Sequence, residues 1–386
     1  MNTTTIFLLS VLILAIIVTI IFLIVHFLHK PKTTELSKII AELPPEQQQK
    51  VRLTLNSNLS TAFSSNSFLL GMGTLENKDY VPTVPKPLRL YSSSSRTPVI
   101  FVPGLCGSQL YCKWKFSESP LLCMNSGADQ NLWITALMLL PESLGGKCWK
   151  RRMLVYWDKT YKNIQGMTSW PNGFGTMKGV DYLSDQPIFN KVITYFNTTS
   201  AYLRQLGYKD GQDMFAAPYE FRLILDETVM DKFIGDLKKL VEYAYRNNGN
   251  KKVALMGHSC GCPLSHTFLL RMSKEWKDTY IQKFISIAGP YGGASRAFRT
   301  MMSGDNLGIP GKQLVFRDIG RSMACIFWML PNETVYKGLD IMKVGQKRYT
   351  LDDYPEMMGN IGLDDQYFHS LQYKKTMFQP NGVKTE

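Results

Sequence analysis

The sequence predicts an α/β fold built on a mostly parallel β-sheet. Short apolar runs typical of buried strands cover 99–102, 152–157, 214–219, 252–257 and 283–289. Segments with helical periodicity lie between several of these runs. Strands that alternate with helices favour a parallel sheet whose two faces are covered by helices.

Helical patterns occupy 189–207, 229–247 and 260–276. The second segment is the clearest, because its apolar residues recur at helical spacing and form one stripe. The stripe consists of Val229, Phe233, Leu237, Leu240, Val241 and Ala244. It predicts a helix that packs with one face on the sheet.

A possible catalytic motif follows the apolar run at 252–257. Gly257, His258, Ser259, Cys260 and Gly261 form G-x-S-x-G, with a helical pattern directly after them. Strand, tight turn and helix around this motif are the nucleophile elbow of the α/β-hydrolase fold, in which the serine is the nucleophile. The glycines are needed because the turn crowds the backbone on both sides of the serine. A Gly/Ser turn without catalytic function is the alternative.

The elbow also predicts an oxyanion hole. The backbone N–H of Cys260, the residue after the nucleophile, would be one donor. The second donor is expected from a loop after an early strand, and "PVIFVPGLCGSQL" at 98–110 offers one. Leu105 or Cys106 would supply its backbone N–H, whereas a plain Pro-Gly turn is the alternative.

The composition is that of a globular protein, with 45% apolar and 12% aromatic residues in 386. The net charge is +13, but zinc-finger spacing, a basic-region helix and aromatic-basic interleaving are all missing from the sequence, so we expect no nucleic-acid partner. Basic runs such as "KCWKRR" suit an anionic lipid surface, although ordinary solvated lysines explain them equally well. No motif indicates a metal or an organic cofactor, and nothing indicates the oligomeric state.

An uncharged apolar run at 6–28 predicts a transmembrane signal-anchor, because 23 residues span a hydrocarbon core of about 30 Å. It is too long for the apolar region of a cleaved signal peptide. Residues 29–95 follow as a stalk or linker, rich in Ser and Asn over part of its length. The hydrolase domain is expected over 96–386.

The orientation of this single-pass protein has two interpretations. Lys30 and Lys32 after the span place the main domain in the cytosol by the positive-inside rule. The N-x-S/T sites and the cysteine pattern instead favour a lumenal or extracytoplasmic domain, which we expect. The candidate glycosylation sites in the domain are Asn197 and Asn332, and Asn2 and Asn58 precede it.

Several further stretches give the sequence a family resemblance. In order, they are "PVIFVPGLCGSQL", "LWITALMLLP", "CWKRRMLVYWDKT", "GYKDGQDMFAAPYEFRL", "VALMGHSCG", "ISIAGPYGGA" with "MMSGDN", "WMLPNETVY" and "RYTLDDYPEMMGNIGLDD". Together they cover about 96–370 and resemble the lecithin:cholesterol acyltransferase family, which includes lysosomal phospholipase A and phospholipid:diacylglycerol acyltransferases.

The resemblance implies an α/β-hydrolase that transfers acyl groups from glycerophospholipids through a Ser259 acyl-enzyme, with Leu105 and Cys260 as the oxyanion donors. It implies a lid over about 292–350 and a membrane-binding insertion over about 108–150. A disulfide between Cys123 and Cys148 would close the lipid-binding loop, whose apolar residues are Trp133, Leu139 and Leu140. A loop tethered at both ends and rich in such residues could insert into a bilayer, and core packing is the alternative.

This chain also departs from the family pattern. Leu105 stands where lysosomal phospholipase A has an acidic residue, and Tyr291 stands where the family has Trp. Glu220 and Arg222 match the D-W-R positions and are expected to be structural.

The sequence does not supply an obvious base for Ser259. Two of the five histidines, His26 and His29, lie at the anchor, and His258 adjoins the nucleophile. His266 lies about 10.5 Å along the elbow helix, too far for direct proton transfer. His369 with Asp305, Asp352 or Asp353 satisfies only the chain order.

The resemblance implies that the catalytic acid and histidine come after the matched stretch, so we expect the domain to be incomplete at its C-terminus, with the last strands of its sheet absent. The predicted function is phospholipid acyl transfer to a sterol, to diacylglycerol or to water at a phospholipid membrane. The alternative is a membrane-anchored, lipid-binding pseudoenzyme.

Overall fold

The computed structural model describes residues 96–115, 126–135, 138, 146–186, 193–305 and 312–377. The chain divides into two compact units, Met1–Ser64 and Ser65–Glu386, and every described residue belongs to the second. The predicted anchor at 6–28 and stalk at 29–95 lie outside the described residues. Among the residues described, no helix is both long enough and apolar enough to cross a bilayer.

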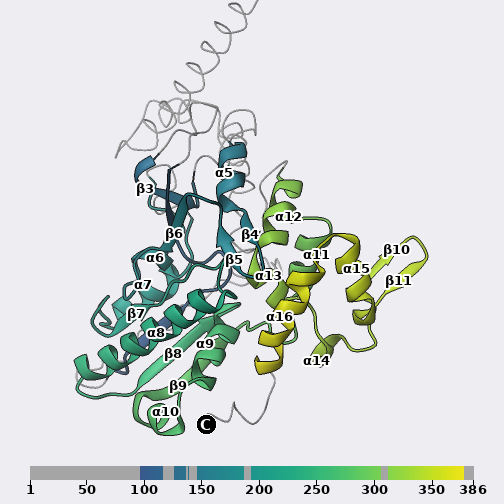
Figure 1. Ribbon diagram of the computed structural model, residues 1–386. Coiled ribbons are helices and arrows are strands. Elements are labelled where there is room, and N and C mark those ends of the chain that lie inside the picture. The colour runs from purple at the N-terminus through teal and green to yellow at the C-terminus, as the bar shows by residue number, and fades with distance from the viewer. Residues whose placement is uncertain are drawn as a thin grey trace, which may run out of the picture. The chain divides into compact units, whose positions relative to one another are not determined.

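The core of the domain is a four-stranded parallel sheet in the order β7-β1-β8-β9 (Figure 1). The strands are β7 (Met214–Ala216), β1 (Val99–Val102), β8 (Val253–His258) and β9 (Ile281–Ile287). All three pairings are parallel, as the sequence predicted. Every residue of β1 is buried, because a central parallel strand has both faces covered. In the described part of the chain, β9 is an edge strand, and Ile287 at its end is 39% exposed.

The helices of the sheet layer are close to those predicted. The long helix α8 (Glu227–Asn247) is capped at its N-terminus by Asp226, whose side chain accepts a hydrogen bond from the Val229 N–H. Of the predicted stripe, all but the half-buried Val229 are buried in α8. The remaining helices of this layer are α6 (Lys178–Asp181), α7 (Asn197–Gln205), α9 (Gly261–Leu270) and α10 (Lys274–Tyr280). The pattern at 260–276 therefore yields two helices, because the Ser273 side chain caps a new one.

A second layer is antiparallel. It is a three-stranded sheet of β3 (Ser126–Trp133), β2 (Leu110–Trp114) and β6 (Met167–Pro171), in that order. Helix α5 (Gly146–Met153) and the hairpin of β4 (Val155–Trp157) and β5 (Tyr161–Asn163) follow β3 in the chain. The run predicted as a strand at 152–157 thus begins as the last residues of α5, where Met153 is buried.

The chain after the parallel sheet is mainly helical. Figure 1 shows these elements in green to yellow, gathered beside the layers described above. They are α11 (Ser295–Met302), α12 (Gln313–Ser322), α13 (Ala324–Trp328), α14 (Glu333–Tyr336), β10 (Met342–Val344), β11 (Lys347–Tyr349), a 3₁₀ turn (Leu351–Asp353), α15 (Tyr354–Asn360) and α16 (Asp364–Met377). All five residues of α13 are buried, so α13 is part of the core.

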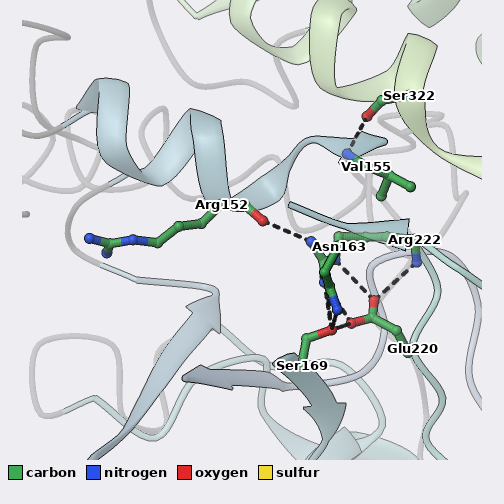
Figure 2. Close-up of polar contacts among 7 residues, drawn as sticks. All are labelled: Arg152, Val155, Asn163, Ser169, Glu220, Arg222 and Ser322. Atoms are coloured by element: carbon green, nitrogen blue, oxygen red, sulfur yellow. Dashed lines mark hydrogen bonds and ion pairs between the residues drawn. The ribbon is translucent and has the colours of Figure 1, made fainter. Parts of the chain in front are cut away.

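A buried ion pair joins these three groups of elements (Figure 2). Arg222 is fully buried and donates to both carboxylate oxygens of Glu220, at 3.0 and 2.7 Å. The same guanidinium donates to the Arg152 carbonyl of α5 at 2.8 Å, to Asn163 Oδ1 of β5 at 2.8 Å and to Ser169 Oγ of β6 at 2.7 Å. The backbone carbonyl of Arg222 accepts from Ala324 N–H at the start of α13.

Removal of the Arg222 charge should destabilise the domain strongly. Arg222→Met leaves the Glu220 carboxylate buried and uncompensated, which costs about 3–5 kcal/mol. Arg348→Met is the matched control, because the Arg348–Asp340 pair is largely exposed and its loss costs less than about 1 kcal/mol. Urea unfolding followed by tryptophan fluorescence measures both. The double variant Glu220→Gln/Arg222→Met should recover part of the loss, and equal losses in Arg222→Met and Arg348→Met would contradict this role.

Candidate active site

Ser259 occupies the sharp turn between β8 and α9. Its φ is 50°, in the left-handed region that residues other than Gly, Asn and Asp seldom adopt and that is enriched at functional sites. Its N–H donates to the Ile287 carbonyl at the end of β9, at 2.8 Å. A Cβ on Gly257 would lie 2.8 Å from Gly261 O, and one on Gly261 would lie 2.3 Å from Val102 O. Both glycines are therefore required by the close approach of backbone to backbone.

The loop after β1 lies directly against this turn. Gly107 N–H donates to Gly104 O at 3.0 Å, and Cys106 has a φ of 60°, so Gly104–Gly107 is a β-turn with positive φ at its third residue, as in type II. A Cβ on Gly104 would lie 2.8 Å from Ser259 Cβ. Leu105 therefore lies next to the nucleophile turn, and Cys260 is buried at the N-terminus of α9.

Ser259 opens into a pocket of about 190 Å³. Leu105, Cys106 and Ser259 line it from the two loops, and Trp133 and Met153 line it from the antiparallel layer. The other lining residues come from α11, α12, α13 and the segments beside them, and most of these are apolar. The two charged exceptions are Arg296 and Asp305. The Arg296 guanidinium donates to both carboxylate oxygens of the buried Asp305, at 2.7 and 3.0 Å. Such a pocket suits a hydrocarbon chain with a polar group at one end.

The thiols around Ser259 are not competing nucleophiles. Burial, together with the nearby Cys260, raises the pKa of Cys106 far above its ordinary value. Burial likewise raises the pKa of Cys260 to about 12 and that of Cys325 well above its usual range. These thiols stay protonated at neutral pH, and a protonated thiol is a poor nucleophile.

The structure corrects the expectation that Trp133 inserts into a bilayer. Its side chain is only 1% exposed, and its indole N–H donates to the Cys106 carbonyl at 2.9 Å. The ring packs between Trp149, Phe221 and Phe316. The physical reason is that an indole N–H with a carbonyl partner and three aromatic neighbours is stabilised in the core.

The remaining residues of the predicted insertion are only partly described. Leu139, Leu140 and Cys123 lie outside the described residues. Cys148 is disulfide-bonded, and its pairing with Cys123 stays a prediction.

Both candidate glycosylation sites in the domain are half-buried. Asn197 is the first residue of α7. Asn332 caps α14, where its Oδ1 accepts from Thr334 N–H and its Nδ2 donates to the Tyr291 carbonyl at 2.7 Å. Asn332 Nδ2, the nitrogen that a glycan would modify, is therefore already hydrogen-bonded in the folded domain.

Within the described residues, no histidine lines the pocket of Ser259. His258 is buried, and its Nδ1 lies 2.5 Å from the Tyr195 hydroxyl. The His266 ring packs edge-on against Tyr291, and burial lowers the pKa of His266.

The alternative triad through His369 is not assembled. His369 Nε2 lies 3.3 Å from the Leu225 carbonyl, and its ring packs against Trp157 and Tyr161. Asp353 accepts from the Thr350 N–H as part of a capping box, and Asp305 pairs with Arg296. Among the described residues, therefore, no histidine is in place to accept the proton of Ser259.

Fold and site together define the class of this protein. A serine on a strained strand-to-helix turn of a parallel sheet, beside a loop from an early strand, is the arrangement of the α/β-hydrolases. The family model described as lecithin:cholesterol acyltransferase matches residues 129–382. The chain belongs to this family, as its motifs predicted.

Curated relatives agree with this assignment. Phosphatidylcholine-sterol acyltransferase of Rattus norvegicus is 32% identical over 287 residues, which is 72% of this chain and 63% of that protein. Lysosomal phospholipase A and acyltransferase of Homo sapiens is 32% identical over 275 residues, 69% of this chain and 65% of that protein. The chain therefore spans slightly less than two thirds of the length of these two relatives.

The close contacts at the elbow predict a sharp difference between two glycine substitutions. Gly261→Ala places a methyl group against Val102 O and should cost about 3 kcal/mol by overpacking. Gly235→Ala in α8 is the control, because nothing lies within 4 Å of its added Cβ and it should stabilise the helix by about 0.5 kcal/mol or more. Thermal unfolding compares them, and an unchanged midpoint for Gly261→Ala would show that the elbow is less crowded than described.

Proposed function

We propose that this protein transfers a fatty acyl group from a glycerophospholipid to an acceptor through an acyl-enzyme on Ser259. The observation that carries the proposal is the position of Ser259, on a strained turn that opens into an apolar pocket also lined by Leu105. The printed names of the relatives, a phosphatidylcholine-sterol acyltransferase and a lysosomal phospholipase A and acyltransferase, support the same chemistry.

In the proposed mechanism, Ser259 Oγ attacks the carbonyl carbon of the phospholipid ester and gives up its proton to a base. The backbone N–H groups of Leu105 and Cys260 stabilise the negative charge on the carbonyl oxygen. Collapse of the tetrahedral intermediate breaks the ester C–O bond and releases a lysophospholipid, whose oxygen takes up the proton. Water, a sterol or diacylglycerol then attacks the acyl-enzyme and releases the acyl product and free Ser259.

The alternative that the sequence left open is a lipid-binding pseudoenzyme. Such a protein would bind lipid without turnover, because no base would take the proton of Ser259. Oxyanion binding alone leaves only a small residual rate enhancement. Lipid binding without acyl transfer is therefore the outcome that distinguishes this second function.

Ser259→Ala tests the two functions directly. With phosphatidylcholine vesicles containing cholesterol or diacylglycerol, the full chain should release lysophospholipid, and Ser259→Ala should lower this rate by about 10³-fold or more. Ser265→Ala is the matched control, because this buried serine lies on α9, the helix that follows Ser259, and its hydroxyl makes no hydrogen bond to any described residue. Comparison of free fatty acid with acylated sterol or triacylglycerol identifies the acceptor. No release by the wild-type chain, with lipid still bound, would instead support the pseudoenzyme.

We also infer that a single N-terminal span anchors the protein and that the domain works on the lumenal or extracytoplasmic side. The disulfide at Cys148 supports this inference, because disulfides persist in oxidising compartments. Digestion with a peptide N-glycosidase should increase gel mobility, and Asn197→Gln should remove part of that shift, since Thr198 and Thr199 beside it are exposed. A cell-expressed chain without any such shift would place the domain in the cytosol.

A further inference from the structure

Tyr195 makes two hydrogen bonds that join the loop after β1 to the nucleophile turn. It belongs to neither motif and lies just before α7, where it is buried with 4% of its surface exposed. Its hydroxyl oxygen lies 2.8 Å from Gly104 N and 2.5 Å from His258 Nδ1. An amide N–H can only donate, so the tyrosine oxygen accepts from Gly104. The direction of the bond to His258 follows the imidazole tautomer, because either the tyrosine O–H or an Nδ1–H can be the donor.

The Gly104–Gly107 turn is packed closely by atoms of Ser259 and Tyr195. A Cβ on Gly104 would lie 2.8 Å from Ser259 Cβ and 3.2 Å from the Tyr195 hydroxyl. A Cβ on Gly107 would lie 2.8 Å from the Tyr195 ring. The Gly104–Gly107 turn is therefore held between the nucleophile on one side and the tyrosine on the other. Burial raises the pKa of Tyr195 far above its ordinary value, so the hydroxyl stays protonated and neutral.

We propose that Tyr195 is a positioning residue that fixes the Gly104–Gly107 turn relative to Ser259. The proposal rests on the proposed function, in which Leu105 supplies an oxyanion N–H. Leu105 follows Gly104 directly, so the hydrogen bond at the Gly104 amide restrains the residue next to the donor. On the far side of the turn, the Trp133 indole N–H holds the Cys106 carbonyl. The turn is thus restrained on both sides of Leu105.

Accurate placement of this turn matters for the reaction. An oxyanion donor acts only when it lies about 2.7–3.1 Å from the oxygen that becomes negatively charged. Displacement of about 1 Å can reduce a rate by about 10²-fold. Because that charge exists only in the transition state and the intermediate, loosening of the turn should lower kcat and leave KM nearly unchanged.

Hydrogen exchange and kinetics on the full chain test the proposal. Tyr195→Phe removes the hydroxyl and keeps the ring. Amide exchange in the peptide covering 101–110, read by mass spectrometry, should accelerate by up to about tenfold, the effect of one lost hydrogen bond. With phosphatidylcholine vesicles, kcat should fall by about 10- to 100-fold with KM unchanged.

Tyr354→Phe is the matched control for the loss of a buried tyrosine hydroxyl. Tyr354 is 2% exposed, and its hydroxyl makes no hydrogen bond within the described residues. It packs against Phe298 and Tyr367, away from the turn. Exchange at 101–110 and kcat should both stay at the wild-type values in Tyr354→Phe.

The outcomes separate this proposal from the proposed function. If Tyr195→Phe shows wild-type amide exchange at 101–110, Tyr195 does not position the turn. The same follows if its KM rises while kcat is unchanged. Neither result contradicts the proposed acyl transfer. If the wild-type chain transfers no acyl group, the proposed function fails and the exchange comparison still decides whether Tyr195 holds the turn. If Tyr195→Phe does not fold, 3,5-difluorotyrosine at position 195 keeps the ring and hydroxyl and weakens the acceptor. This variant should accelerate amide exchange at 101–110, but less than the loss of the hydroxyl would. Exchange at the wild-type rate would overturn the proposal.

Discussion

The buried guanidinium of Arg222 is the constraint on which the arrangement of this domain depends. A fully buried charge is stable only when it is paired and its donors are satisfied. Here the partners are Glu220 and three acceptors from α5, β5 and β6, so these elements must come together around Arg222. The Arg222 carbonyl and the bond from Val155 N–H to Ser322 Oγ attach α12 and α13 to the same assembly. The elements α5, α12 and α13, which carry residues of the pocket wall, are therefore joined at one polar centre.

The serine turn depends on a different kind of constraint, which is steric. Gly257, Gly261 and Gly104 lie where backbone approaches backbone or the nucleophile itself, and any side chain there would collide. The left-handed conformation of Ser259 persists because the strands and α9 determine it from both sides. The ion pair and hydrogen bonds of Arg222 hold the pocket walls in place, whereas close backbone packing at the glycines fixes the turn that carries Ser259.

The parts of this structure that local patterns determine could be predicted from the sequence. The strands at 99–102 and 252–257, the stripe of α8 and the elbow around Ser259 depend on residues near one another in the chain. Trp133 was misjudged, because an apolar side chain in an insertion looks the same whether it faces lipid or core. Its partners, Cys106 and Phe316, are far away in the sequence.

The position of Tyr195 between the two loops could not be predicted from the sequence either, because its partners are also distant in the chain. Its hydrogen-bond partners lie 91 and 63 residues away, and no motif marks the position. The division of 260–276 into α9 and α10 is different, because Ser273 as a cap could have indicated it.

Among the residues that the structure describes, β9 lies at the edge of the parallel sheet, and this position limits which strand could extend the sheet. A strand that joins β9 in parallel must arrive through a crossover of about a dozen residues or more, almost always right-handed. Its carboxyl end would then lie at the same margin as the ends of β8 and β9, where Ser259 N–H meets the Ile287 carbonyl. A residue that ends such a strand would arrive beside the nucleophile on the side away from Leu105. Sheet topology therefore defines a direction from which Ser259 can be approached, whichever chain segment supplies that strand.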